Sequence, residues 1–273
     1  MARRTPSLTH EIVHVTPEIA RQWLATNTHN RNIRASIVAA YARDMGNGDW
    51  MLNGEPIKFA ADGTLLDGQH RLSAIVKAET SIDLLVVRGV AVEAQDTMDS
   101  GITRKFADQL HLAGEAEAQS LSAILRKILL WEVGYRMRGG GLKVTHAELA
   151  DTLKRHPVAR DCAAYGRRRA TAANLHVSTI GFIFWLLRSI DFEQAAWFID
   201  RVCDGVGLHA GHPALILRER IRRERDTNNG RADVDVVLAL AIYAWNAYRD
   251  GRSIEKLQLP KGGLNNDSFP QPK

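Results

Sequence analysis

The stretch LLDGQHRL at residues 65–72 carries the strongest fold signal in this sequence. Its leucines end a short apolar run that predicts a strand, and the apolar spacing from Leu72 to Val76 predicts a helix. The residues between them are polar, and Gly68 suits a tight turn. The sequence therefore predicts a strand, a turn and a helix, with the pentapeptide Asp67–Arg71 at the junction.

This pentapeptide carries groups that suit a phosphate. Backbone N–H groups at a helix start favour an anion, and Gly68 lets a ligand approach the backbone closely. Arg71 can clamp a phosphate with two parallel hydrogen bonds, and His70 can donate to it or move a proton. Asp67 can hold a divalent metal. The alternative is that Asp67 and Gly68 only cap the helix, while His70 and Arg71 lie on the surface.

The surrounding segments predict a small sheet with helices. Asp62-Gly63 between two apolar runs is a strong hairpin signal. Thr16 can cap a helix that has Pro17 at its first position. Strands are expected at residues 11–15, 56–60, 64–66 and 82–87, and helices from residue 17, at 34–45, after the pentapeptide, and from about residue 92.

The chain after about residue 114 has a different, helical pattern. Thr145 and Glu148 form a capping box, and a further helix is expected from Pro157 onward. The fold class is therefore α+β, with a sheet-containing domain at residues 10–112, an all-α C-terminal domain at 115–256 and a disordered tail at 257–273. Helices are expected at residues 116–133, 145–155, 178–189, 192–204, 213–225 and 234–249.

Composition narrows the class of protein. The 273 residues are 45% hydrophobic and 25% charged, which is ordinary for a soluble globular protein. The two cysteines, Cys162 and Cys203, form no metal or redox motif and are expected to be buried thiols. We expect a cytoplasmic protein with no membrane partner, because no signal peptide or membrane-spanning run is recognisable. The net charge of +5 is compatible with a nucleic-acid partner.

Residues 65–72 also resemble a known signature. They look like the Asp-Gly-Gln-His-Arg motif of the ParB/sulfiredoxin superfamily. The motif is similar to the Gly-Glu-Arg-Arg box of ParB proteins, which contacts CTP, and to the Gly-Cys-His-Arg box of sulfiredoxin, which contacts ATP. The resemblance covers about residues 10 to 110, and the segment from Asn30 to Arg71 looks like a ParB-like protein common in phages and mobile elements.

The resemblance implies a ParB/sulfiredoxin-like N-terminal domain that binds a nucleoside triphosphate, ATP or CTP, with Mg²⁺ at Asp67. The phosphates would be contacted by Gly68, Gln69, His70 and Arg71. Two departures matter. Gln69 stands where sulfiredoxin has its nucleophilic cysteine, which excludes reduction of sulfinic acid, and His70 replaces the first arginine of the ParB box.

Three arginines outside the pentapeptide are further candidates for nucleotide contact. Arg31 and Arg34 lie at a helix start, where the superfamily places a basic residue near the nucleotide. Arg104 follows the Asp99–Gly101 break and can reach phosphate from a second loop. A solvated surface is the alternative for all three. Glu55 is the best additional carboxylate for a catalytic role beside Asp67 and His70, although a structural role suits it as well.

The helical part offers two candidate DNA contacts. One is the basic stretch at residues 218–225, which two glutamates dilute, so a salt-bridged solvated helix suits it better. Arg167, Arg168 and Arg169 form an undiluted basic run, which suits the backbone phosphates of DNA and equally suits plain solvation. DNA is therefore the expected macromolecular partner, and the superfamily resemblance also implies a homodimer.

Several functions fit these residues. The first is a ParB-like nucleotide-binding protein that hydrolyses NTP or transfers phosphate and acts with or on DNA. The second is a metal-dependent DNA nuclease in which His70 and Asp67 activate a metal-bound water. The third is a DNA-binding or regulatory protein without enzymatic activity, and a kinase or DNA-base-modifying enzyme is a fourth.

Overall fold

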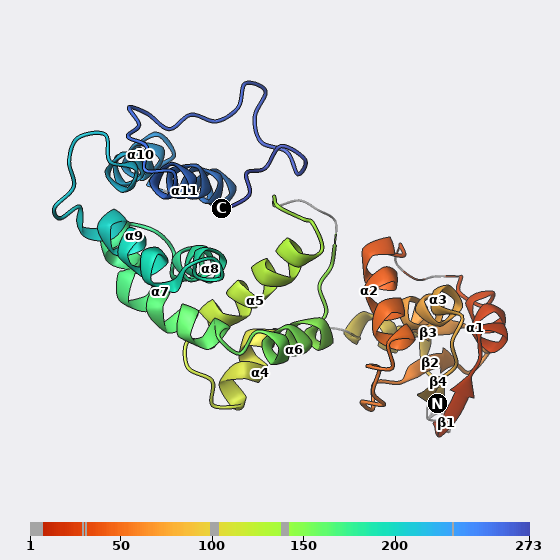
Figure 1. The fold of residues 1–273 in the computed structure, drawn as a ribbon. Helices are drawn as coiled ribbons and strands as arrows, with labels where there is room; N and C mark the ends of the chain where they lie inside the picture. The colour runs from red at the N-terminus through yellow and green to blue at the C-terminus, as the bar shows by residue number, and fades with distance from the viewer. Residues whose placement is uncertain (1–7, 29, 31, 99–103, 138–141, 231) are drawn as a thin grey trace. The chain divides into compact units, whose positions relative to one another are not determined.

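The computed structural model describes residues 8–28, 30, 32–98, 104–137, 142–230 and 232–273 (Figure 1). Contacts divide the chain into two compact units. The N-terminal unit comprises Met1–Thr103 and Gly141–Glu148, and the helical unit comprises Arg104–Gly140 and Leu149–Lys273. The predicted α+β class is confirmed, because a small mixed sheet precedes a long series of helices.

The N-terminal unit contains a four-stranded sheet in the order β1-β4-β2-β3. The β4 strand pairs antiparallel with β1 and parallel with β2, and β2 pairs antiparallel with β3. All four predicted strands are present, and the last is longer than expected because its pairing with β1 continues to Arg88. The strands are β1 (Thr9–Val15), β2 (Ile57–Ala60), β3 (Leu65–Asp67) and β4 (Ile82–Val90).

The turn between β2 and β3 forms as its sequence predicts. Gly63 has φ 89°, a left-handed conformation that glycine adopts without steric cost. The Asp62 carboxylate accepts a hydrogen bond from the Thr64 N–H at 2.9 Å, and the Ala60 N–H donates to the Thr64 carbonyl at 2.9 Å. This hairpin sets where β3 ends and therefore where the pentapeptide begins.

Helices cover one face of the sheet. The Thr16 hydroxyl caps the first helix by accepting from the Ile19 N–H at 3.3 Å, with Pro17 at the first position as predicted. Buried side chains alternate along β4, so Leu84 and Val86 face the helices. The elements are α1 (Pro17–Leu24), α2 (Ala35–Gly46), α3 (Gln69–Ala78) and the short 3₁₀ helix η1 (Val92–Thr97).

The core of this unit joins the sheet to all three helices. It comprises Val15, Ala20, Val38, Ala42, Met45, Ile57, Phe59, Leu65, Leu72, Ala74, Ile75, Leu84 and Val86. Leu65 and Leu72 flank the pentapeptide and are both fully buried. Burying a leucine stabilises a fold by about 1.5–3 kcal/mol, so packing on both sides fixes the position of the turn.

The helical unit contains the helices expected from the sequence, with ends shifted by a few residues, and also α4 (Phe106–Leu112), which the sequence did not predict. The expected helices are α5 (Ala118–Glu132), α7 (Ala159–Ala173), α8 (Val177–Arg188), α9 (Phe192–Asp204), α10 (Pro213–Thr227) and α11 (Val234–Arg249). The predicted sheet-containing domain ran to residue 112. The α4 helix instead packs against α5, with Phe106 and Leu110 buried, so the division falls before α4.

The α7 and α8 helices approach each other through two glycines. A Cβ atom on Gly166 would lie 2.4 Å from the Val177 carbonyl oxygen, and one on Gly181 would lie 2.8 Å from the Cys162 carbonyl oxygen. Both contacts are with backbone, which cannot rotate away. This crossing therefore requires glycine at both positions.

A capping box starts α6 (His146–Arg155), as predicted. The Thr145 N–H donates to the Glu148 carboxylate at 2.7 Å, and the Glu148 N–H donates to the Thr145 hydroxyl at 3.2 Å. Arg43 of α2 pairs with Glu148 at 2.7 Å, and the Thr145 hydroxyl donates to Asp44 at 2.7 Å. These contacts hold the start of α6 against α2 in the N-terminal unit.

The tail at 257–273 differs from the expected disorder. It has no helix or strand among its residues, yet Phe269 is only 4% exposed and its ring contacts Trp131 edge to face at 6.1 Å. The Trp245 Nε1–H donates to the Lys273 carbonyl at 2.8 Å, and Asn266 accepts from the Arg136 N–H at 2.9 Å. A single buried aromatic and a few directed hydrogen bonds outweigh the polar composition from which we predicted disorder.

Both cysteines are free and buried, as expected. Burial raises the pKa of Cys162 to about 11, and burial also raises the pKa of Cys203 to about 11. The thiolate is the nucleophilic form of cysteine, so neither residue is suited to nucleophilic catalysis near neutral pH.

No single helix in the described ranges is long and apolar enough to cross a membrane. The α7 and α8 helices pass such a test only when taken together, and they are bent by 118° where they meet. Most of α8 is buried within the helical unit.

Candidate functional site

The predicted strand, turn and helix form at the pentapeptide. Gly68 is the N-cap residue of α3 and has φ 108° and ψ 4°. The helix begins immediately after it, because the Leu72 N–H donates to the Gly68 carbonyl at 3.0 Å. A Cβ atom at residue 68 would lie 2.3 Å from the Cδ1 atom of Ile57, whose side chain is fully buried. Backbone conformation and packing therefore both select glycine here.

Arg71 holds the segment that leads into β2. Its guanidinium donates to the Glu55 carbonyl at 2.5 Å and to the Pro56 carbonyl at 2.8 Å. Its side chain is 12% exposed and also lies 3.4 Å from the Asp67 carboxylate. The sequence predicted either a phosphate clamp or a surface residue. In this structure the planar guanidinium of Arg71 instead donates hydrogen bonds to two neighbouring backbone carbonyls.

Asp67 is already balanced by two cations. Its Oδ2 atom lies 3.4 Å from the Arg71 Nη2 atom and 3.4 Å from the Lys58 Nζ atom. A divalent ion at this oxygen would meet two positive charges at close range, so Asp67 as arranged does not fit the Mg²⁺ role expected of it. Among the described residues, no group of three His, Cys, Asp or Glu side chains is placed to hold a metal ion.

His70 connects α3 to the start of α2. Its side chain is 8% exposed, and its Nε2 atom accepts a hydrogen bond from the Arg34 N–H at 3.0 Å. An Nε2 atom that accepts in this way carries no proton. In this arrangement, His70 positions the N-cap residue of α2, and its Nε2 atom cannot serve as a general acid.

A polar network that the sequence did not predict extends from Gln69. The buried Gln69 side chain accepts from the Asn27 amide at 2.9 Å. The Asn30 amide donates to the Asn27 side-chain oxygen Oδ1 at 2.6 Å and to the Leu65 backbone carbonyl at 2.7 Å, and the Asn30 side-chain oxygen accepts from Gln95 at 3.0 Å. Asn27 and Asn30, which lie between α1 and α2, are thereby held against the pentapeptide. The run of asparagines at residues 27, 30 and 32 is the only signal in the sequence.

The other predicted nucleotide contacts have different surroundings. The Arg34 backbone N–H contacts His70, and its side chain is exposed. Arg104 is exposed but belongs to the helical unit. Glu55 is exposed and supplies its carbonyl to Arg71. Arg31 and the Asp99–Gly101 break lie outside the described residues.

The three arginines expected to contact DNA have different surroundings. Arg169 pairs with the Asp200 carboxylate, and its guanidinium lies 4.0 Å from the centre of the Tyr165 ring. Burial, reinforced by Asp200, raises the pKa of Tyr165, which donates a 2.9 Å hydrogen bond to that carboxylate. Arg167 is 68% exposed and 3.5 Å from Glu117, and Arg168 is exposed. Arg169 is therefore structural, whereas its two neighbours face solvent.

Comparisons of the chain with protein-family models, with curated proteins and with solved structures gave no match. The site is therefore interpreted from its own geometry and from the sequence motif at residues 65–72. That geometry comprises a left-handed glycine at a helix start, two cations beside one carboxylate, and a helix end fixed by buried polar contacts.

Proposed function

We propose that the N-terminal unit binds the phosphates of a nucleoside triphosphate, ATP or CTP, at the turn between β3 and α3, and that the protein acts with or on DNA. The observation that carries this proposal is Gly68, which starts α3 in a left-handed conformation directly after a strand. The positive end of the α3 dipole lies at this glycine, and the start of a helix favours an anion.

The charges beside the turn favour the same ligand. Lys58 and Arg71 contribute two positive charges, and Asp67 contributes one negative charge. The excess is one positive charge in a partly buried setting, where electrostatic attraction is stronger than in water. A phosphate oxygen near Lys58 would replace part of its contact with Asp67, and Arg71 would keep the loop before β2 in place.

Hydrolysis of the bound triphosphate is part of the proposal. Phosphoryl transfer depends mostly on positioning and charge neutralisation, so it does not require His70 to move a proton. Lys58 and the α3 N-terminus would neutralise charge, and Gln69 and His70 would hold the helix end in place. The resemblance of residues 65–72 to the ParB/sulfiredoxin signature supports a nucleotide as the ligand. We assign no metal ligand to Asp67, because Lys58 and Arg71 already neutralise it.

Nucleotide binding tests this half of the proposal. We expect Lys58→Met to weaken ATP or CTP binding to the full chain about 10-fold, which corresponds to about 1.4 kcal/mol for one lost charged contact. Arg71→Lys should weaken it as well, because lysine cannot grip both carbonyls. Isothermal titration with ATP, CTP and GTP provides the measurement, and phosphate release measured in parallel tests hydrolysis.

Lys77→Met is the matched control, because Lys77 is exposed in the last turn of the same helix. It removes the same charge at the opposite end of α3 and should leave affinity unchanged. If the unaltered chain binds none of the three nucleotides, or if Lys58→Met binds them as tightly as Lys77→Met does, the proposal is wrong.

The DNA half rests on Arg167 and Arg168, which are exposed on α7 next to the structurally engaged Arg169. We expect Arg167→Ala with Arg168→Ala to reduce the salt dependence of duplex DNA binding, with the slope of log K against log salt falling by about 2, or one per lost phosphate contact. Fluorescence anisotropy at several salt concentrations measures that slope. Arg222→Ala with Arg223→Ala, a double change on α10, is the control, and equal slopes for both double variants would contradict the assignment.

A further inference from the structure

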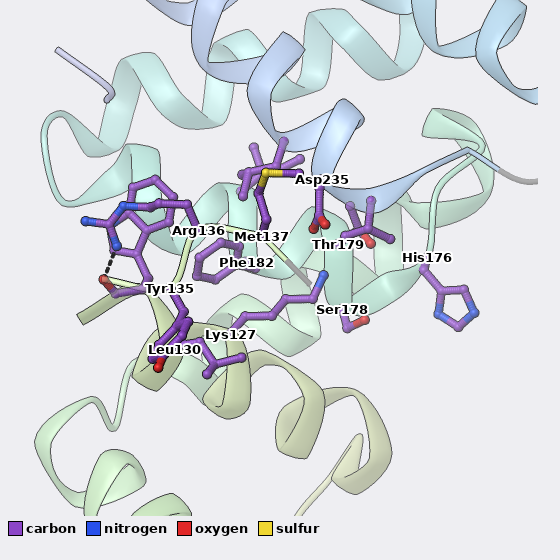
Figure 2. Close-up of a pocket in the computed structure, with 14 residues that line it drawn as sticks. Lys127, Leu130, Tyr135, Arg136, Met137, His176, Ser178, Thr179, Phe182 and Asp235 are labelled. Atoms are coloured by element: carbon purple, nitrogen blue, oxygen red, sulfur yellow. Dashed lines mark hydrogen bonds between the residues drawn. The ribbon is translucent and has the colours of Figure 1, made fainter. Parts of the chain in front are cut away.

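The helical unit contains a pocket that the proposed function does not use. It has a volume of about 220 Å³ and lies between α5, the segment that follows α5, and the first turns of α8 and α11 (Figure 2). An apolar cavity of ~150 Å³ holds one benzene ring. This pocket therefore has room for an aromatic ring with a substituent.

Aromatic and aliphatic side chains form most of its wall. Trp131 of α5 and Phe182 of α8 meet edge to face, with ring centres 6.0 Å apart. Tyr135 and Met137 line the pocket from the segment after α5, and Leu238 lines it from α11. Such a wall favours a ligand whose body is apolar and flat, since aromatic rings prefer stacked or edge-to-face neighbours.

Ser178 of α8 and Asp235 of α11 contribute polar groups to the lining. Figure 2 shows the Lys127 side chain extending from α5 toward Ser178 and Asp235, while the His176 ring is turned away. The Lys127 Nζ atom also lies 5.9 Å from the centre of the Phe182 ring. A positive charge next to an aromatic wall is suited to a ligand that combines a ring with an anionic group.

Arg136 adds a second positive charge to the lining. Its guanidinium lies 4.0 Å from the centre of the Trp131 ring and donates to the Trp131 carbonyl. Its backbone N–H donates to Asn266 at 2.9 Å, so the C-terminal tail keeps this wall in place. Lys127 and Arg136 together outweigh Asp235 by one charge, so the lining as a whole favours an anion.

We propose that this pocket is a binding site for a small aromatic molecule that carries one acidic group. The ring would lie against Trp131 and Phe182, and the acidic group would meet Lys127 and the Ser178 hydroxyl. The same chemistry occurs in an aromatic carboxylic acid and in a nucleoside monophosphate. The site is separate from the turn at Gly68, so neither proposal depends on the other.

The test compares two probes that share a naphthalene ring, the anionic 2-naphthoate and the neutral 2-naphthalenemethanol, with the full chain. Affinities come from isothermal titration, and saturation-transfer NMR reports contact with the ring. We expect 2-naphthoate to bind at least 10-fold more tightly. Lys127→Met should remove that preference while leaving the affinity of the alcohol unchanged, and Ser178→Phe should abolish binding of both by filling the pocket.

Arg126→Met is the matched control, because Arg126 is exposed at the preceding position of α5 and carries the same charge. It should change neither affinity. Thermal unfolding of each variant shows whether it is folded. Displacement of 2-naphthoate by indole-3-carboxylate or by GMP supports the site and distinguishes the two sources of ligand. The proposal is overturned if 2-naphthoate does not bind, if neither competitor displaces it, or if folded Lys127→Met and Ser178→Phe bind it unchanged.

Discussion

Gly181→Ala is expected to destabilise the helical unit by about 2–3 kcal/mol, in the range of overpacking in a well-packed core. The added Cβ atom would lie 2.8 Å from the Cys162 carbonyl oxygen and 2.5 Å from the Cδ1 atom of Ile124. Ile124 is fully buried, so its side chain has no open space to move into. The two helices would have to separate, and the higher helix propensity of alanine offsets only about 1 kcal/mol.

Urea unfolding followed by circular dichroism and tryptophan fluorescence measures this effect. Gly46→Ala is the control for the change from glycine to alanine in a helix, because a Cβ atom there meets nothing within 4 Å. That variant should be neutral or slightly stabilising. A Gly181→Ala protein that unfolds at the same urea concentration as the unaltered chain would show that α7 and α8 are not in backbone contact.

Gly68→Ala is expected to destabilise the N-terminal unit by about 3 kcal/mol and to weaken nucleotide binding. A non-glycine residue in a sparsely populated backbone conformation costs about 1–3 kcal/mol, and φ at this position is 108°. Packing adds to this cost, because the Cβ atom would lie 2.3 Å from the Cδ1 atom of Ile57. Chemical unfolding of the variant, with ATP titration under native conditions, measures both effects.

Ile57→Val separates the two causes, because it removes the methyl group that the new Cβ atom would meet. Alone, it should cost about 0.5–1.5 kcal/mol. Combined with Gly68→Ala, it should cost less than the sum of the single changes, with a coupling of about 1 kcal/mol in a double-mutant cycle. Strict additivity would mean that backbone conformation alone selects glycine at this position.

The local elements around the site were predictable because their signals are local. Thr16 and Pro17 start α1, Gly63 turns the hairpin, and Thr145 with Glu148 starts α6. In each case the residues that form the contact lie within a few positions of one another. The same holds for the strand, turn and helix at residues 65–72.

The partners of the site residues were not predictable, because the chain brings them from distant positions. Arg71 reaches back to the Glu55 carbonyl, and His70 accepts from Arg34. Neither contact has a sequence period or motif. For the same reason, the polar composition of the tail predicted disorder, whereas the buried side chain of Phe269 anchors it.

The contact between Arg71 and two backbone carbonyls has a consequence for how this site would vary among related chains. A carbonyl is present whichever amino acid occupies residues 55 and 56, so mutation there leaves the acceptors intact. Residue 71 cannot vary in the same way, because only the planar guanidinium of arginine presents several donors in a fixed geometry. Covariation between columns of an alignment would therefore miss this contact, and evolution could change the loop before β2 while retaining the arginine that holds it.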